Sequence, residues 1–204
     1  MHEGKFIVIE GIDGAGGETQ SKLLLKYLSD RGKKVEFFSY PNPNSPVGKL
    51  IYEFLGKKFD LEPATQFLLY TSDILLDKEK ILSAIESSKI VISDRYFTST
   101  LAYQCTKGYS LENGLELAKL LDLPIPDLVI FLDIPAETSM KRKLKEKNKL
   151  DRHEEDKIYL ENVRETFKKL IKDKVFAKEW AVVDADRSIE EVFADVKTIV
   201  EKHL

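Results

Sequence analysis

Five short hydrophobic runs along the chain predict β-strands. They cover residues 6–10, 34–38, 89–93, 128–133 and 180–184. The first is a β-branched run closed by Gly11, and the fourth, Leu-Val-Ile-Phe-Leu-Asp, has the strongest strand character. Apolar runs of this kind are typical of strands that are buried on both faces.

The segments between these runs carry hydrophobic residues at helical spacing. The predicted helices are residues 19–28, 47–55, 63–88, 111–121, 136–147, 157–174 and 189–202. Strands separated by helices imply right-handed crossovers and a parallel sheet covered on both faces, so the expected fold class is α/β. No repeat, low-complexity tract or linker interrupts the pattern, and we therefore expect residues 1–204 to form one domain.

The composition describes an ordinary folded protein, with 43% hydrophobic and 33% charged residues. The formal net charge of -3 argues against nucleic acid as a partner bound through bulk charge. The single cysteine, Cys105, cannot form an internal disulfide and fits a reducing compartment. No stretch is apolar enough to span a bilayer, and the first residues do not read as a secretory signal. We expect a cytoplasmic protein with no membrane partner.

A glycine-rich turn joins the first predicted strand to the first predicted helix. Gly11 and Gly16 have the spacing of the phosphate-binding frame GxxxxGK[ST]. Glycines let backbone N–H groups curve around a phosphate, and the helix N-terminus adds a positive dipole end. A tight turn without a ligand is the alternative. The candidate nucleotide-binding residues here are Gly11, Ile12, Asp13, Gly14, Ala15, Gly16, Gly17, Glu18, Thr19 and Gln20.

The next two residues depart from that frame, which expects Lys and then Ser or Thr. The lysine normally bridges β- and γ-phosphate oxygens, and the hydroxyl normally holds Mg²⁺. Gly17 supplies no charge, and Glu18 brings a carboxylate that must point away or contact the metal through water. Thr19 offers a hydroxyl one residue later. We expect nucleotide binding to survive and phosphoryl transfer to be slow, unless a basic residue from elsewhere replaces the lysine.

Five segments together resemble the thymidylate kinase family of nucleoside monophosphate kinases. They are FIVIEGIDGAG with TQ at 6–20, ISDRYFTSTLAYQ at 92–104, PDLVIFLDIP at 126–135, DRHEEDKIYLENVRETF at 151–167 and VVDADRSIEEV at 182–192. The combination of EGIDG, DRY and AYQ is specific to this family rather than to P-loop proteins in general. The resemblance implies a three-layer P-loop kinase fold with a five-stranded parallel sheet. It also implies Mg-ATP as phosphoryl donor, dTMP as acceptor and a homodimer.

The resemblance also assigns roles on the acceptor side. Asp13 would reach the acceptor's 3′-hydroxyl and the metal-bound waters, although a helix-start cap is the alternative. Asp94 and Arg95 follow a buried strand at the sheet edge where ligands bind in such folds. Asp94 would be linked to the metal and Arg95 would bind the acceptor phosphate, unless they form a purely structural pair.

Further acceptor contacts follow from the same resemblance. Tyr70 would stack on thymine, and the bulk of Tyr103 would disfavour a ribose 2′-hydroxyl; both could instead be helix-packing residues. The full set of substrate-binding candidates is Asp13, Tyr40, Tyr70, Arg95, Ser99, Tyr103 and Gln104.

On the donor side, the resemblance implies that Arg142 stacks against adenine and that the backbone at Arg187 contacts it. A mobile lid at about residues 143–156 would close over the phosphates. Gly14 leaves the turn without the arginine of one family branch, so Lys149 and Arg152 are the candidate lid cations. Candidate catalytic residues are Asp13, Asp94, Arg95 and Arg152, and candidate metal contacts are Asp94 and, through water, Glu18.

Two arginines common in the family are absent on the acceptor side. Ile74 stands where the family has an arginine that contacts the thymine carbonyl, and residues 40–44 lack one that touches the acceptor phosphate. Polar contacts carry base discrimination, so another pyrimidine monophosphate is an alternative substrate. Further alternatives are a catalytically weak or inactive nucleotide-binding paralogue and a nucleoside kinase acting on a sugar hydroxyl.

Overall fold

The computed structural model describes residues 4–146 and 150–204, and within them it contains the predicted parallel sheet. The strands are β1 (Lys5–Gly11), β2 (Val35–Ser39), β3 (Ile90–Asp94), β4 (Leu128–Asp133) and β5 (Glu179–Asp184). They lie in the order β2-β3-β1-β4-β5, and every neighbouring pair is parallel. The expected α/β fold with a five-stranded parallel sheet is confirmed.

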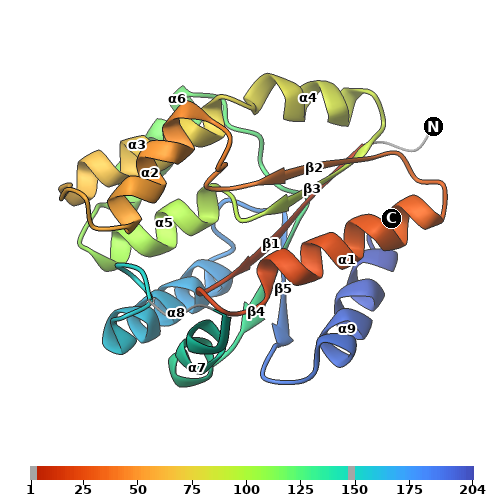
Figure 1. The fold of residues 1–204 in the computed structure, drawn as a ribbon. Helices are drawn as coiled ribbons and strands as arrows, with labels where there is room; N and C mark the ends of the chain where they lie inside the picture. The colour runs from red at the N-terminus through yellow and green to blue at the C-terminus, as the bar shows by residue number, and fades with distance from the viewer. Residues whose placement is uncertain (1–3, 147–149) are drawn as a thin grey trace.

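Helices cover both faces of this sheet (Figure 1). They are α1 (Gly17–Asp30), α2 (Pro46–Leu55), α3 (Pro63–Leu75), α4 (Lys78–Glu86), α5 (Phe97–Thr106), α6 (Leu111–Leu120), α7 (Ala136–Glu146), α8 (Lys157–Lys172) and α9 (Ile189–Glu201). α1 and α9 pack together on one face, and α5 packs against α3 and α8 on the other. The three central strands are buried between these layers, which explains their continuous hydrophobic runs.

The single helix expected at residues 63–88 is wrong, because the chain turns between α3 and α4. The backbone N–H of Asp77 donates to the Ile74 carbonyl at 3.1 Å, closing a tight turn. The Asp77 carboxylate accepts from Lys80 Nζ at 2.7 Å and from Tyr40 Oη at 3.5 Å. A short acidic side chain with such partners favours a turn, rather than a continuous helix, at its position.

Helix α5 was not among the predicted helices. Most of its residues are buried, including polar Thr98, Thr100 and Gln104. Because it has no clear division into a hydrophobic and a solvated face, helical periodicity is a weak signal here. This helix follows β3 directly and carries several of the acceptor-side candidates.

The pairing of β1 with β3 brings two predicted motifs to the same edge of the sheet. Ile9 pairs with Asp94, and the backbone N–H of Arg95 donates to the Ile9 carbonyl at 2.9 Å. The glycine-rich turn after β1 and the Asp-Arg pair after β3 therefore face each other at the carboxyl ends of the strands.

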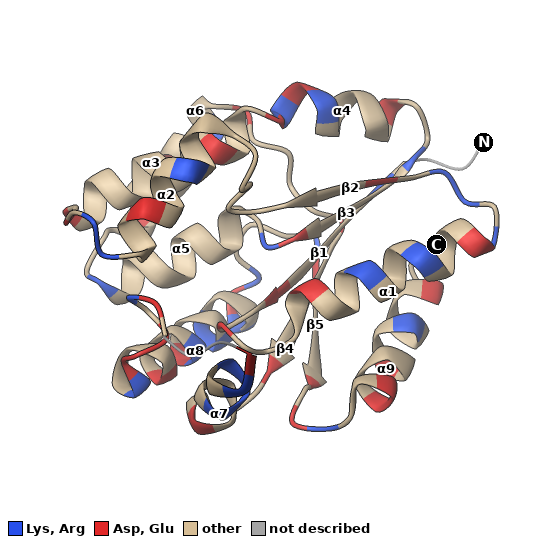
Figure 2. Cartoon of the chain, viewed as in Figure 1, with Lys and Arg blue, Asp and Glu red and all other residues tan. Residues whose placement is uncertain are grey.

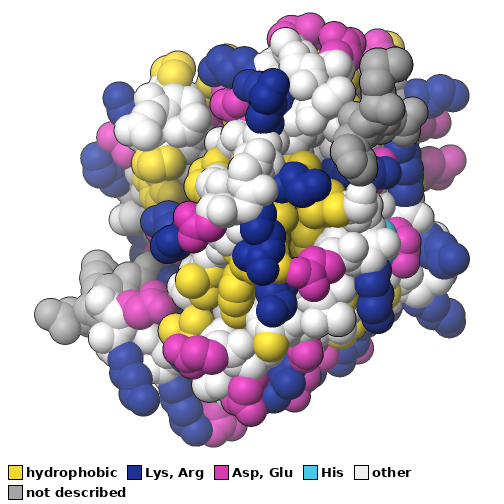
Figure 3. All heavy atoms as spheres, turned by 90° about the vertical axis from the view of Figure 1, so that its right-hand side faces the viewer, with side chains coloured by type: hydrophobic (Ala, Val, Ile, Leu, Met, Phe, Trp, Pro, Cys, Tyr) yellow, Lys and Arg dark blue, Asp and Glu magenta, His cyan; other side chains and the backbone are white. Residues whose placement is uncertain are grey.

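Figure 3 views the right-hand side of Figure 1, where hydrophobic side chains lie between scattered charged ones. Within residues 4–146 and 150–204, no helix combines the length and apolar character needed to cross a membrane.

Candidate functional site

The glycine-rich turn has the backbone conformation of a phosphate cradle. Gly14 and Gly16 have φ values of 80° and 96°, in the left-handed region that favours glycine. A Cβ on Gly14 would lie 2.7 Å from the Ser139 carbonyl oxygen of α7, so this position has no room for a side chain. Gly16 caps α1, and its carbonyl accepts from the Gln20 N–H at 3.0 Å. The turn thus points the start of α1 into a cavity of about 430 Å³.

Lys143 of α7 lines this same cavity. Its ammonium lies 2.8 Å from Glu146 Oε2 and 4.0 Å from Glu154 Oε1, and its side chain is only 25% exposed. In Figure 2, α7 carries Lys and Arg positions below the turn that follows β1. The sequence favoured a solvated face for this basic run, so Lys143 is a cavity residue that sequence reasoning missed. Nothing in a row of lysines shows which one faces inward.

Gly17 and Glu18 occupy the two anomalous positions of the turn. A Cβ on Gly17 would lie 2.7 Å from Asp94 Oδ1, so the glycine lets the Asp94 carboxylate approach the backbone. The Glu18 side chain is 69% exposed and pairs with Lys22, one helical turn later. Burial, reinforced by the negative charge of Glu18, raises the pKa of Asp94 to about 6, although Arg95 opposes the shift.

Asp94 is a described side chain that fits the Mg²⁺ implied by the sequence resemblance. Asp94 is buried and lines the phosphate cavity, and from the described residues its carboxylate accepts one long hydrogen bond, from Ser39 Oγ at 3.4 Å. Carboxylate oxygen is a suitable Mg²⁺ ligand. Within the described residues no group of three or more His, Cys, Asp or Glu side chains could hold a metal. Phosphate oxygens and waters would therefore complete the coordination, as is usual for Mg²⁺.

Arg95 and Asp13 form the centre of the site. The Arg95 guanidinium donates to the Gly11 carbonyl at 2.9 Å, to Ser99 Oγ at 3.1 Å and to Asp13 Oδ1 at 2.8 Å. Asp13 Oδ2 accepts from Tyr103 Oη at 3.0 Å. Burial acts to raise the pKa of Asp13, but Arg95, the hydrogen bond from Tyr103 and the charge of Lys143 act with other neighbours to outweigh it, and the pKa is lowered. Asp13 is therefore an ionised acceptor.

Glu10, at the end of β1, positions the start of α5. It is fully buried and accepts from Tyr96 N at 3.0 Å, Thr98 Oγ1 at 2.6 Å and Ser99 N at 3.0 Å. Ser99 Oγ also donates to it. Burial raises the pKa of Glu10, while Arg95 and these donors oppose the shift. Glu10 ties the helix that carries Ser99 and Tyr103 to the strand that carries the phosphate turn.

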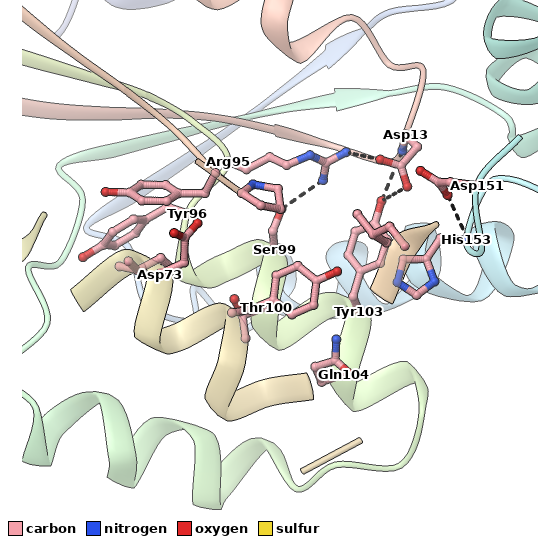
Figure 4. A pocket seen from close by; sticks show the side chains of 15 residues that line it. Asp13, Asp73, Arg95, Tyr96, Ser99, Thr100, Tyr103, Gln104, Asp151 and His153 are labelled. Carbon is pink, nitrogen blue, oxygen red and sulfur yellow. Dashed lines mark hydrogen bonds and ion pairs between the residues drawn. The ribbon is translucent and has the colours of Figure 1, made fainter. Parts of the chain in front are cut away.

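A second cavity adjoins the first, and Figure 4 shows its lining. All seven substrate-binding candidates contribute to it, namely Asp13, Tyr40, Tyr70, Arg95, Ser99, Tyr103 and Gln104. Burial raises the pKa of the Tyr70 hydroxyl, so this ring is neutral and available for stacking. Ile74 also lines the cavity, as do His153 and Thr100, which sequence reasoning did not single out. Asp13 and Arg95 belong to both cavities.

Several donor-side candidates point elsewhere. Arg152 donates to Phe54 O at 3.1 Å and to Phe59 O at 2.9 Å, and it pairs with Asp60 at 2.6 Å, outside both cavities. Gln20 Nε2 donates to the Ile189 carbonyl at 3.1 Å rather than facing the turn.

The two predicted adenine contacts lie close together. Arg142 reaches back to the carbonyls of Gly14 at 3.5 Å and Ala185 at 2.8 Å. It also donates to the carbonyl of Arg187, at 3.4 Å, while the Arg187 side chain pairs with Asp195. Lys149 lies outside the described residues. The ligand contacts expected of these residues stay predictions.

Comparisons with known proteins agree with this geometry. The family model for thymidylate kinase matches residues 9–196. The chain is 39% identical to the thymidylate kinase of Thermosipho africanus, over 98% of each chain. It is 37% identical to that of Thermoanaerobacter sp. (strain X514), over 99% of this chain and 100% of the relative. A solved thymidylate kinase from Candida albicans superposes with a TM-score of 0.80 at 26% identity, over 98% of this chain and 92% of that one. The chain therefore belongs to the thymidylate kinase family and is a nucleotide-binding kinase.

Proposed function

We propose that the protein transfers the γ-phosphoryl group of Mg-ATP to dTMP, forming dTDP. The observation that carries this proposal is the pair of adjoining cavities that share Asp13 and Arg95. One is enclosed by the phosphate turn, and the other is lined by aromatic side chains on α3 and α5. Such a pair of cavities can hold the polyphosphate of a donor nucleotide in one and the base of an acceptor nucleotide in the other, so that the phosphates of the two nucleotides face each other. The full-length similarity to thymidylate kinases supports the same reaction.

In this reaction the protein aligns the reactants and balances charge, since phosphoryl transfer needs little covalent help. Arg95 binds the acceptor phosphate, and Asp13 and Ser99 hold its guanidinium in place. The backbone N–H groups of the turn bind the donor phosphates. Mg²⁺, when bound with ATP, neutralises phosphate charge, and Asp94 is the side chain that would hold it.

The phosphate turn is a divergent P-loop in this proposal, because Gly17 and Glu18 stand in place of Lys and Ser or Thr. Lys143 is the cation that replaces the missing lysine. It is the lysine that lines the phosphate cavity among the described residues, whereas Arg152 is engaged with α2 and Asp60. Arg152 would have to leave these contacts to reach the phosphates. Glu18, which faces solvent beside Lys22, would contact the metal only through water.

The remaining parts of the proposal concern the organisation of the chain. Residues 1–204 form one kinase domain, and the segment at about 143–156 acts as a lid over the phosphates. Arg142 and the backbone at Arg187 lie together beside the turn and would hold adenine. We propose a homodimer in the cytoplasm, by analogy with the family.

The test is to incubate the pure protein with Mg-ATP and, separately, dTMP, dUMP, UMP, CMP, AMP and thymidine. The proposal predicts that dTMP is phosphorylated fastest. Faster turnover of another monophosphate would refute the substrate assignment, and phosphorylation of thymidine would indicate a nucleoside kinase. Tight binding of ATP and dTMP in calorimetry without turnover would instead identify a non-catalytic paralogue, the alternative that Gly17 favours.

A further inference from the structure

Three residues that line the acceptor cavity each have a buried polar atom with no hydrogen-bond partner within the described residues. The atoms are Tyr96 Oη, Gln104 Oε1 and His153 Nε2. Buried polar groups in native proteins are nearly always paired, so each such atom calls for a partner. Because these three residues line one cavity, a ligand bound there is the partner to consider for each of them.

His153 lies in the loop before α8, whereas Gln104 lies within α5 and Tyr96 is the N-cap of that helix. The Asp151 carboxylate holds the loop, because the backbone N–H groups of His153 and Glu154 both donate to its Oδ1, at 2.9 and 3.1 Å. Arg152 N donates to the Leu55 carbonyl at 3.2 Å, which fixes the loop to the end of α2. The imidazole is 5% exposed, so the loop delivers a buried ring into the cavity.

Three aromatic rings lie around the imidazole. Its centroid lies 5.3 Å from that of Tyr159, 5.7 Å from that of Tyr103 and 6.2 Å from that of Phe54. Figure 4 shows it beside the Tyr103 ring, at the end of the cavity where Asp13 lies and away from Tyr96 and Asp73.

Burial, with the nearby charge of Lys107, lowers the pKa of His153 to about 4. The ring is therefore neutral at physiological pH, with one nitrogen that donates and one that accepts.

We propose that His153 is a further substrate-binding residue, whose Nε2–H donates to the 3′-hydroxyl of the acceptor's deoxyribose opposite the Asp13 carboxylate. This inference rests on the proposed function. An ionised carboxylate only accepts and would repel the acceptor phosphate, whereas a hydroxyl can donate to Asp13 and accept from His153 at once. The deoxyribose of dTMP has one free hydroxyl, so Asp13 and His153 would both hydrogen-bond to this single group.

The experiment compares two acceptors, dTMP and 3′-deoxythymidine monophosphate, which lacks only this hydroxyl. kcat/KM is measured for the full chain with saturating Mg-ATP. Three variants are used. His153→Leu removes the hydrogen bond, and His153→Gln places an amide N–H near the position of Nε2. Tyr159→Phe is the matched control, since it keeps a ring beside the imidazole and removes only a hydroxyl outside the cavity lining, which donates to the Tyr103 carbonyl at 3.0 Å.

We expect His153→Leu to lower kcat/KM for dTMP about tenfold, and for the deoxy analogue by less than about threefold. His153→Gln should recover most of the loss on dTMP, and Tyr159→Phe should affect both acceptors equally. An equal loss on both acceptors in His153→Leu, or no recovery in His153→Gln, would overturn the role of His153. If the wild-type protein neither binds nor phosphorylates either acceptor, the proposed function itself fails, which is a distinct result.

Discussion

Replacing Lys143 by Met tests whether α7 supplies the charge that the phosphate turn lacks. Methionine keeps the length and apolar stem of the side chain while removing the ammonium. The Lys143 side chain is 25% exposed and lines the phosphate cavity, so the change should alter charge there with little loss of packing. We expect kcat to fall and the fold to persist.

The magnitude follows from one charge-assisted hydrogen bond to a phosphate oxygen, which is worth about 1.5–3 kcal/mol. Partial exposure allows water to screen the charge, so the lower end of the range applies. Since about 1.4 kcal/mol corresponds to a factor of ten, kcat should fall about tenfold.

The assay is steady-state turnover of dTMP with Mg-ATP, with Lys141→Met as the control. Lys141 lies on the same helix but is 68% exposed and pairs with Glu137. Its replacement should leave kcat within about twofold of wild type. If the two variants had the same kcat, Lys143 would not be the replacing cation.

The remaining predictions concern Gly17, Glu10 and His153. Gly17→Ala should lower kcat about tenfold, because the added Cβ would lie 2.7 Å from Asp94 Oδ1 and displace that carboxylate. In the Lys143→Met background, Gly17→Lys should have a higher kcat than Gly17→Ala, because the new ammonium restores the missing charge. Glu10→Val should lower the free energy of unfolding, measured in urea, by on the order of 4 kcal/mol, because Tyr96 N, Thr98 Oγ1 and Ser99 N lose their acceptor. Glu10→Gln is the control: it keeps one acceptor oxygen and should lower that free energy by about 1 kcal/mol. The pKa of His153 falls to about 4 on folding, so its contribution to stability is complete above about pH 6.5 and is lost between pH 6.5 and 4. His153→Gln should reduce the loss of unfolding free energy between pH 6.5 and 4 by up to about 3 kcal/mol. An unchanged pH dependence would contradict a buried neutral imidazole.

Local patterns in the sequence were enough to predict the sheet, because its strands are buried on both faces and read as unbroken hydrophobic runs. The glycine-rich turn and the Asp94–Arg95 pair were likewise predictable, since each directly follows such a run. Residues whose environment comes from distant elements were not. Glu10 is hidden within a strand, and its partners lie 86 to 89 positions away.

The same reasoning explains why the sequence pattern did not single out Lys143 as a residue that lines the phosphate cavity. Lys143 and its neighbours differ only in which side of α7 they occupy, and that side is decided by packing of Ser139 against the turn. The break between α3 and α4 also depends on a tertiary contact, that of Asp77 with Tyr40. Sequence pattern predicts elements well when burial alone determines them, and less well when a single polar contact does.

The proposed cation, Lys143, belongs to α7 rather than to the phosphate turn, and this affects when its positive charge reaches the phosphates. A lysine in the turn would be fixed beside the phosphates, and its Cβ would occupy the space that Asp94 now uses. Lys143 instead comes from the helix that leads into the proposed lid, and it lies against Glu146 and Glu154 on either side of residues 147–149. Donor phosphates carry more negative charge than these two carboxylates, so binding of ATP would draw the ammonium toward the turn. Moving Lys143 would alter its contacts with Glu146 and Glu154 at once. In the proposed arrangement, Lys143 would reach the donor phosphates as the proposed lid closes rather than before it.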